Sequence, residues 1–162
     1  MRSLLLLRHA RTEDIRPGHS DHARRLTARG EREAALLGEY LRGSGPPVDL
    51  VICSPATRAR QTATALGLSA PTVIADRLYN AGGDDIVAVL RGLAADVTNV
   101  LVVGHAPGLP AVVHDLADRD GSDPAALAVV DARFPAGALA VLSVSEGWAD
   151  LRSAALVSVR LP

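Results

Sequence analysis

LLLLRHA, residues 4–10, is the stretch that decides the fold, because four leucines run without interruption into Arg8 and His9. A short continuous apolar run of this kind is typical of a strand buried on both faces inside a parallel sheet. In open α/β sheets, ligands bind in the crevice beyond the carboxyl ends of the strands. The sequence therefore predicts that Arg8 and His9 emerge where a functional site is expected.

The composition predicts one domain with an aliphatic core. A chain of 162 residues is long enough for one full core, so we expect a single domain over residues 1–162. Hydrophobic residues make up 48% of the chain and aromatic residues 2%, so alanine, valine and leucine must fill this core. The net charge of -1 provides no general attraction to nucleic acid or to an anionic membrane, and we expect neither as a partner.

The sequence also favours a cytoplasmic protein. No apolar run approaches the roughly 18 residues of a membrane span, and the run of four leucines is shorter than a signal-peptide core of roughly 7 to 15 residues. One cysteine, Cys53, excludes an internal disulfide and a cysteine-based zinc cluster. The chain contains no lysine, so arginine also fills ordinary surface roles, and only arginines at strand ends are informative about anion binding.

Strand and helix patterns alternate along the chain, with a polar loop at 11–25. Further strands are predicted at 48–53, 71–75 and 100–103, with two closing strands within 138–145 and 154–161 that could form a hairpin around Glu146-Gly147. Helices are predicted from Thr27 to the GSGPP break at 43–47, from Ser54-Pro55 to Leu66, over 86–93 with Asp84 or Asp85 as N-cap, and over 109–116. This alternation predicts an α/β fold, a three-layer α/β/α sandwich with a mostly parallel central sheet.

Four chemically reactive or cationic side chains follow the ends of these strands. Arg8 and His9 follow the first strand, Arg58 lies in SPATR after the second, and His105 follows the later strand. The carboxyl ends of parallel strands share one edge of a sheet, and helix N-termini add unpaired N–H donors there. Arginine matches the oxygens of a phosphoryl group, and a neutral imidazole can accept that group covalently. We therefore expect a phosphoryl-binding pocket with His9 as the nucleophile.

Four ordered segments resemble the histidine phosphatase superfamily, and most closely its short SixA-type phosphohistidine phosphatases. They are RHA at 8–10, DHARRLTARG at 21–30, SPATRARQTA at 54–63 and GHAPGL at 104–109. The resemblance implies a phosphoglycerate mutase-like fold, His9 as the phosphorylated residue, and Arg8, Arg58 and His105 as ligands of the transferring phosphoryl group. It implies no metal and no cofactor. Ala10 stands where the superfamily usually has glycine, which is a mild departure.

A general acid is missing from the expected region. Larger relatives use a glutamate after the SPxxR segment, but this chain has no glutamate between Glu39 and Glu146. Asp76, Asp84 and Asp85 could replace it, although they are more simply interpreted as a surface residue and two helix caps. An alkoxide leaving group needs that proton, whereas imidazole, with a conjugate-acid pKa of about 6.5, departs readily. The absence favours the labile P–N bond of phosphohistidine, and we expect a phosphorylated protein, such as a phosphorelay domain, as the partner.

Several alternatives stay open. The protein could act on small or Ser/Thr phosphate esters, or bind phosphate without turnover. His19, His22 and Asp21 could suggest a metal site, but two histidines in a polar loop are a weak signal, and Asp21 is expected to orient Arg25 or a neighbouring residue. Cys53 and Arg58 are one residue too close for a cysteine-phosphatase loop, and His114 is expected to be structural or exposed. The sequence does not determine the oligomeric state.

Overall fold

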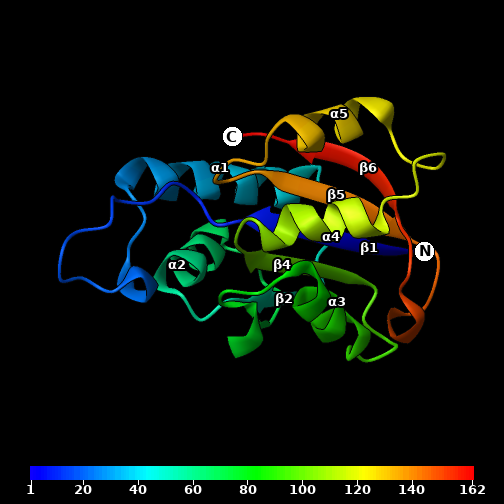
Figure 1. Cartoon of the computed structure of the whole chain (residues 1–162), viewed down its shortest axis with the longest axis horizontal. Helices are drawn as coiled ribbons and strands as arrows, with labels where there is room; N and C mark the ends of the chain where they lie inside the picture. Colours follow the sequence, from blue (N-terminus) through cyan, green and yellow to red (C-terminus); the bar gives the residue numbers. More distant parts are fainter.

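The computed structural model describes residues 1–162, and a six-stranded sheet runs through its middle (Figure 1). The strands are β1 (Arg2–Arg8), β2 (Leu50–Cys53), β3 (Thr72–Ile74), β4 (Asn99–Gly104), β5 (Leu139–Val144) and β6 (Ala155–Arg160). The α-helices are α1 (Ala28–Gly43), α2 (Thr57–Leu66), α3 (Gly83–Arg91), α4 (Gly108–Leu116) and α5 (Pro124–Ala132), and short 3-10 turns lie at Asp21–Ala23, Asp76–Leu78 and Trp148–Asp150. No helix is long and apolar enough to cross a membrane.

The leucine run forms a strand buried on both faces, as its sequence predicts, and this strand lies in the middle of the sheet. The strand order is β3-β2-β4-β1-β5-β6, in which β1 pairs in parallel with β4 and antiparallel with β5. Successive side chains of a strand point to opposite faces, and each of the four leucines is fully buried. Leu4 and Leu6 pack in one core cluster, whereas Leu5 and Leu7 pack in the other. Both faces of β1 are therefore covered.

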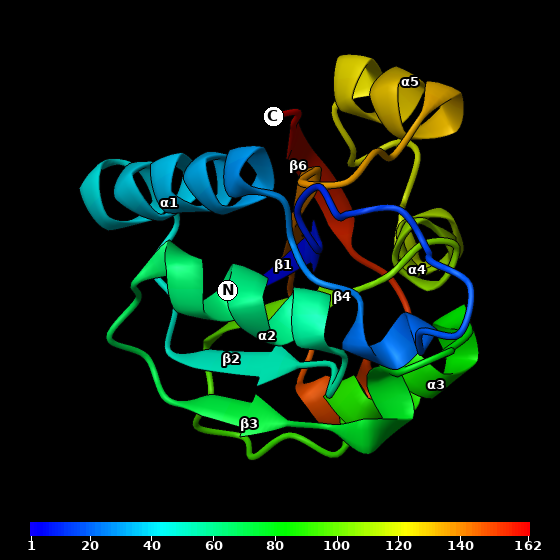
Figure 2. The ribbon, with the colours of Figure 1, turned by 90° about the vertical axis from the view of Figure 1, so that its left-hand side faces the viewer.

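Helices cover the two faces of the sheet and make the three-layer α/β/α sandwich that the alternation predicts. Figure 2 shows α1 and α2 on one side of the strands and α3, α4 and α5 on the other. The aliphatic composition fits these two layers, because the larger cluster holds only Trp148 and Phe134 among aromatic residues. The two antiparallel closing strands are also present, with the turn at 148–150 between them.

Helix ends agree with the sequence in part. Thr27 caps α1 by accepting a hydrogen bond from the Gly30 amide at 3.0 Å. The expected start of the next helix at Pro55 is wrong, because Ser54 and Pro55 lie before α2 and Ala56 is its N-cap. The expected cap of α3 is also wrong: Gly82 is the N-cap, and the Asp85 carboxylate accepts from its amide at 3.2 Å. A carboxylate can accept a hydrogen bond from an unpaired amide both from the N-cap position and from the third residue of the helix. The presence of two aspartates therefore does not show which residue is the N-cap.

One helix was not predicted at all. α5 begins after Asp123, whose carboxylate accepts from the Ala126 amide at 2.8 Å, and Pro124 occupies the first turn. Its length of nine residues and largely apolar composition leave no clear helical period. α5 lies beside β6, which extends the sheet beyond the parallel part.

Candidate active site

The carboxyl ends of β2, β4 and β1 lie side by side, and Figure 2 faces this edge of the sheet. In the ladder, Arg8 is level with Gly104, and Cys53 is level with Val103. The next residues are tied across the strand ends, because the His9 amide donates to the Gly104 carbonyl at 2.9 Å. The rings of His9 and His105 consequently lie 5.3 Å apart between centroids. Two of the four predicted site residues are therefore direct neighbours.

His9 has one ring nitrogen fixed and the other free of protein partners. Nδ1 lies 2.8 Å from the carbonyl oxygen of Ala10, which can only accept, so Nδ1 carries the proton and donates. The Ala10 amide in turn donates to Thr62 Oγ1 at 3.0 Å, and this hydroxyl donates to the Arg58 carbonyl at 2.7 Å. Nε2 is left with its lone pair, as a nucleophile requires.

Burial keeps the His9 imidazole uncharged. The residue is 5% exposed. Desolvation, opposed by the hydrogen bond to Ala10 and assisted by the charges of neighbouring side chains, lowers its pKa to about 3. The pKa of His105 is lowered to about 4, first by burial and next by the positive charge of Arg58. Both imidazoles are therefore neutral near pH 7.

Ser54 orients the second imidazole. His105 Nε2 lies 2.7 Å from Ser54 Oγ, which already accepts from the Ala56 amide at 3.3 Å. This arrangement favours donation by the hydroxyl to Nε2, which leaves the proton of the neutral ring on Nδ1. His105 Nδ1 is buried and has no hydrogen-bond partner within the protein. It is a donor available to an anion.

Arg8 and Arg58 hold their guanidinium groups in different ways. Arg58 lies in the first turn of α2 and is 5% exposed, while its Nη1 donates to the Asp21 carbonyl oxygen at 2.9 Å. Arg8 donates through Nη1 to the carbonyl of Phe134 at 2.9 Å. Burial lowers the pKa of Arg8, and the positive charges of Arg24 and Arg58 lower it further. The arginines therefore form one cationic group that an anion can neutralise.

Two residues at this edge were missed in the sequence. Arg24 forms an ion pair with Asp21 at 3.1 Å and donates to Thr12 Oγ1 at 2.9 Å. Tyr79 donates its hydroxyl proton to the Asp21 carboxylate at 2.9 Å, and its ring lies 5.9 Å from that of His105. The D-x-x-R spacing of DHARR was a signal for Arg24. Nothing in the sequence around Tyr79 indicated its role.

Of the two expectations for Asp21, orientation of a neighbouring residue is confirmed and orientation of Arg25 is not. The Asp21 side chain contacts Arg24 and Arg58, whereas Arg25 is exposed. Burial would raise the pKa of Asp21, but the Tyr79 hydrogen bond and the charges of Arg58 and Arg24 outweigh it and lower that pKa. Asp21 is therefore ionised at neutral pH.

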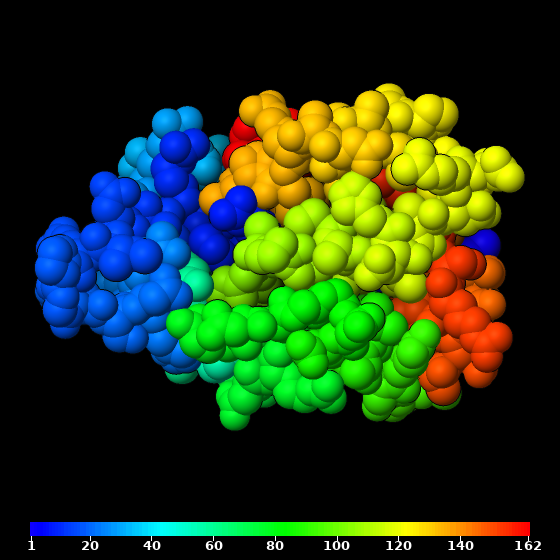
Figure 3. Space-filling model, in the orientation of Figure 1, coloured from blue at the N-terminus to red at the C-terminus, as the bar shows by residue number.

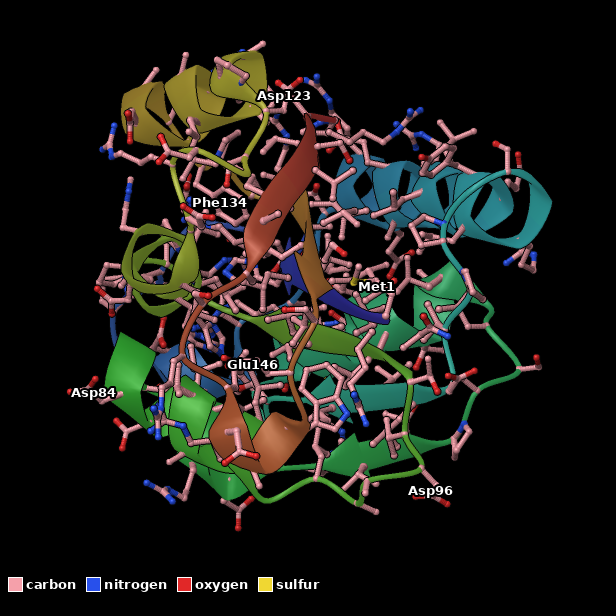
Figure 4. All side chains as sticks on the ribbon, turned by 90° about the vertical axis from the view of Figure 1, so that its right-hand side faces the viewer. Met1, Asp84, Asp96, Asp123, Phe134 and Glu146 are labelled. Carbon is pink, nitrogen blue, oxygen red and sulfur yellow. The ribbon has the colours of Figure 1, made fainter.

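None of the other candidate acids contacts the histidines. Asp76 and Asp84 are exposed, and Asp85 caps α3 and pairs with Arg77 at 3.3 Å. Figure 4 looks at the opposite end of the molecule and labels Met1, Asp96 and Glu146. Arg2, at the start of β1, donates to the Glu146 carbonyl, which places that residue at the far end of the strand from Arg8.

The remaining candidates from the sequence lie outside this cluster or are unreactive. Burial raises the pKa of the Cys53 thiol to about 12, so it is not a thiolate at neutral pH. His114 is half-exposed and lies 3.4 Å from Asp131. His22 packs edge-on against Tyr79, with ring centroids 4.9 Å apart. The structure contains no cluster of three or more histidine, cysteine or acidic residues that could hold a metal ion.

A sheet edge with two neutral imidazoles, one buried guanidinium and two partly buried ones defines a class of α/β protein suited to holding a phosphoryl group next to histidine. The chain belongs to the histidine phosphatase superfamily (branch 1), whose model matches residues 4–86. It is an enzyme of the phosphatase class and resembles SixA proteins within that superfamily.

Individual relatives extend this similarity over nearly the whole chain. The uncharacterized protein Rv1276c of Mycobacterium tuberculosis is 42% identical over 158 residues, which cover 96% of this chain and 99% of the relative. A protein of Nakamurella multipartitia, provisionally named phosphohistidine phosphatase SixA, has a TM-score of 0.89 at 43% identity and covers 99% of this chain, with 96% of its own chain matched. A protein of Agrobacterium tumefaciens with the same provisional name has a TM-score of 0.84 at 27% identity, covering 99% of this chain and 98% of its own.

Proposed function

We propose that this phosphatase hydrolyses phosphohistidine on a protein substrate through a covalent phosphohistidine at His9. The observation that carries the proposal is the state of the His9 ring. Its Nδ1 proton is held by the Ala10 carbonyl, and its neutral Nε2 faces no protein partner. Such a nitrogen can attack phosphorus without first losing a proton.

The reaction proceeds in two displacements. In the first, the Nε2 lone pair of His9 forms a bond to phosphorus as the P–N bond of the substrate breaks, and the departing imidazole takes up a proton from water. In the second, a water oxygen attacks phosphorus, the bond to His9 breaks, and the surplus proton passes to solvent. Inorganic phosphate leaves, and His9 regains its lone pair.

Arg8, Arg58 and His105 stabilise the phosphoryl group during both displacements. The guanidinium groups supply charge-assisted donors, and His105 Nδ1 supplies a neutral one. Because these donors are already ordered by Phe134, Asp21 and Ser54, little reorganisation accompanies the transfer. The mechanism needs no metal and no cofactor.

The electrostatics of Asp21 support a labile leaving group. It is the one carboxylate hydrogen-bonded to a site arginine, and its pKa is lowered, so it has no proton to give at neutral pH. An imidazole leaving group departs without a strong acid, whereas an alkoxide does not. Phosphohistidine is therefore preferred over serine or threonine phosphates, and aryl phosphates with good leaving groups are expected to turn over as well.

The test is a trapping experiment. Brief incubation with a protein carrying radiolabelled phosphohistidine, followed by denaturing quench, should leave an alkali-stable, acid-labile label on the enzyme. The label should be absent in His9→Ala and present in His114→Gln, the matched control outside the site. A wild-type protein that binds phosphate but is never labelled would instead be a binding module without turnover.

A comparison of substrates separates the remaining alternative. Turnover of a phosphohistidine protein, a phosphothreonine peptide and p-nitrophenyl phosphate is measured in one assay. The proposal expects the phosphohistidine protein to have the highest kcat/KM and the phosphothreonine peptide the lowest. A higher value for phosphothreonine would favour a general phosphomonoesterase.

A further inference from the structure

Asp21 connects three side chains of the site through one residue. Its main-chain carbonyl accepts from Arg58 Nη1 at 2.9 Å, and its Oδ2 accepts from Arg58 Nη2 at 3.2 Å. The same Oδ2 accepts from the Tyr79 hydroxyl at 2.9 Å, while Oδ1 pairs with Arg24 Nη2 at 3.1 Å. Both oxygens are therefore engaged, each by a guanidinium of the site.

The polar loop that carries Asp21 is fastened at its base. Thr12 and Leu26 form an isolated bridge, and the Leu26 amide donates to the Gln61 side chain of α2 at 2.8 Å. The tip of the loop, 13–20, is largely exposed and carries no regular element. This blue segment projects from the body of the molecule in Figure 3. The contacts of Asp21 therefore tie the loop to the site beyond its anchored base.

An arginine side chain has many rotamers. Its guanidinium group is therefore ordered before an anion binds only if neighbouring residues hold it in place. Arg58 is buried. The Nε atoms of Arg58 and Arg24 have no hydrogen-bond partner within the protein. Arg24 and Arg58 pair with the two oxygens of the same Asp21 carboxylate, at 3.1 and 3.2 Å, so their guanidinium groups lie close together. The charge of Arg24 also contributes to lowering the pKa of Arg8 and of His105. Arg24 is thus a third guanidinium of the site.

We propose that Asp21 is a positioning residue that holds the Arg58 and Arg24 guanidiniums in place for the phosphoryl group, and that the Tyr79 hydroxyl holds Asp21. This inference rests on the proposed function, because it assigns these arginines to a phosphoryl ligand. With neutral histidines, Arg8, Arg24 and Arg58 against Asp21 leave two positive charges, which matches a phosphoryl dianion.

The direction in which Asp21→Asn changes phosphate affinity distinguishes a positioning role from a purely electrostatic one. Asp21→Asn removes a negative charge near the anion, so a purely electrostatic role predicts tighter binding of inorganic phosphate. A positioning role predicts weaker binding, because an amide has one acceptor oxygen for the donors that the carboxylate engages with two. We expect phosphate affinity to fall about 10-fold and kcat/KM for p-nitrophenyl phosphate to fall at least as much.

The experiment compares wild type, Asp21→Asn, Tyr79→Phe and Asp14→Asn by phosphate titration calorimetry, steady-state kinetics and thermal unfolding. Asp14 is an exposed carboxylate of the same loop, so it controls for the change in charge. Tyr79→Phe keeps the charge and the ring, and we expect a smaller loss of phosphate affinity, about 3-fold. Tighter phosphate binding in Asp21→Asn, or unchanged binding in both variants, overturns the proposal.

Two further outcomes are also decisive. If Asp21→Asn does not fold, Tyr79→Phe decides alone, since it leaves every guanidinium pairing partner in place. If the wild type binds phosphate but never forms the covalent label, the proposed function fails while the phosphate titration still tests the role of Asp21.

Discussion

His9 and His105 come from opposite halves of the chain, yet their rings lie 5.3 Å apart with an interplanar angle of 56°. The parallel register of β1 and β4 produces this closeness, because Arg8 is level with Gly104 and each histidine is the next residue. Both rings are neutral, so they do not repel each other as cations would. The proposed mechanism depends on this closeness, because it assigns attack on the phosphoryl group to one imidazole and donation to the other.

The hydrogen bond between Ser54 and His105 has a measurable role. Ser54→Ala removes the donor to Nε2 and frees the other tautomer, which places the lone pair on Nδ1 toward the anion. We expect kcat/KM for p-nitrophenyl phosphate to fall about 10-fold. Ser158→Ala, at an exposed position of β6, is the control and should match wild type. Equal activity in the two variants would remove Ser54 from the mechanism.

The lowered histidine pKa values predict how stability depends on pH. Unfolded histidine has a pKa of about 6.5, whereas His9 and His105 have folded-state values of about 3 and 4. On acidification the unfolded state gains protons that the folded state does not, so stability falls below about pH 6.5. Each histidine contributes a slope of up to about 1.4 kcal/mol per pH unit, ending as its folded pKa is passed.

Urea unfolding of wild type and His9→Gln at several pH values tests this linkage. The variant should lose less stability than wild type between about pH 6.5 and about pH 4. Ser158→Ala, a change at an exposed residue without a titratable side chain, should follow wild type. Parallel curves for wild type and His9→Gln would mean that His9 titrates alike in the folded and unfolded states.

Thr62 links the nucleophile loop to α2. Its hydroxyl accepts from the Ala10 amide and donates to the Arg58 carbonyl. Thr62→Val keeps the shape but leaves the Ala10 amide unpaired in a buried place, so we expect a loss of about 1–3 kcal/mol in the free energy of unfolding. Denaturant titration measures this loss, with Thr64→Val at an exposed position of α2 as the control. Equal stability of both variants would show that water or a shifted loop satisfies the amide.

Cys53 is expected to be dispensable for the reaction. Its thiol is fully buried and its pKa is raised to about 12, so alkylating reagents should react slowly with the folded protein. Cys53→Ala should keep turnover of p-nitrophenyl phosphate within about 2-fold of wild type and lose about 1 kcal/mol of stability. Rapid inactivation by iodoacetamide, absent in Cys53→Ala, would instead point to a thiol mechanism.

We expect the activity to be insensitive to metal chelators. The guanidinium groups supply the positive charge that a metal would otherwise provide, and the neutral His9 needs no metal to become nucleophilic. Hydrolysis of p-nitrophenyl phosphate should therefore be unchanged after dialysis against EDTA. Loss of activity that a divalent metal restores would contradict the proposed mechanism.

The sequence by itself determined the sheet and the edge of the sheet that carries the site. The apolar run at 4–7 is typical of a strand buried on both faces, and the residues directly after parallel strands share one edge of the sheet. For this reason the neighbourhood of His9 and His105 could be predicted from local patterns. α5 could not, because its short apolar sequence has no distinct helical period.

Only the tertiary structure decided which side chains complete the site. Asp21, Arg24 and Tyr79 lie in a loop and after a short edge strand, where no periodicity limits the direction of a side chain. Their contacts depend on how the loop at 11–25 folds back onto α2 and the turn at 76–78. Most strands and helices of this chain follow from local sequence, but hydrogen bonds between separate loops depend on the path of the whole chain.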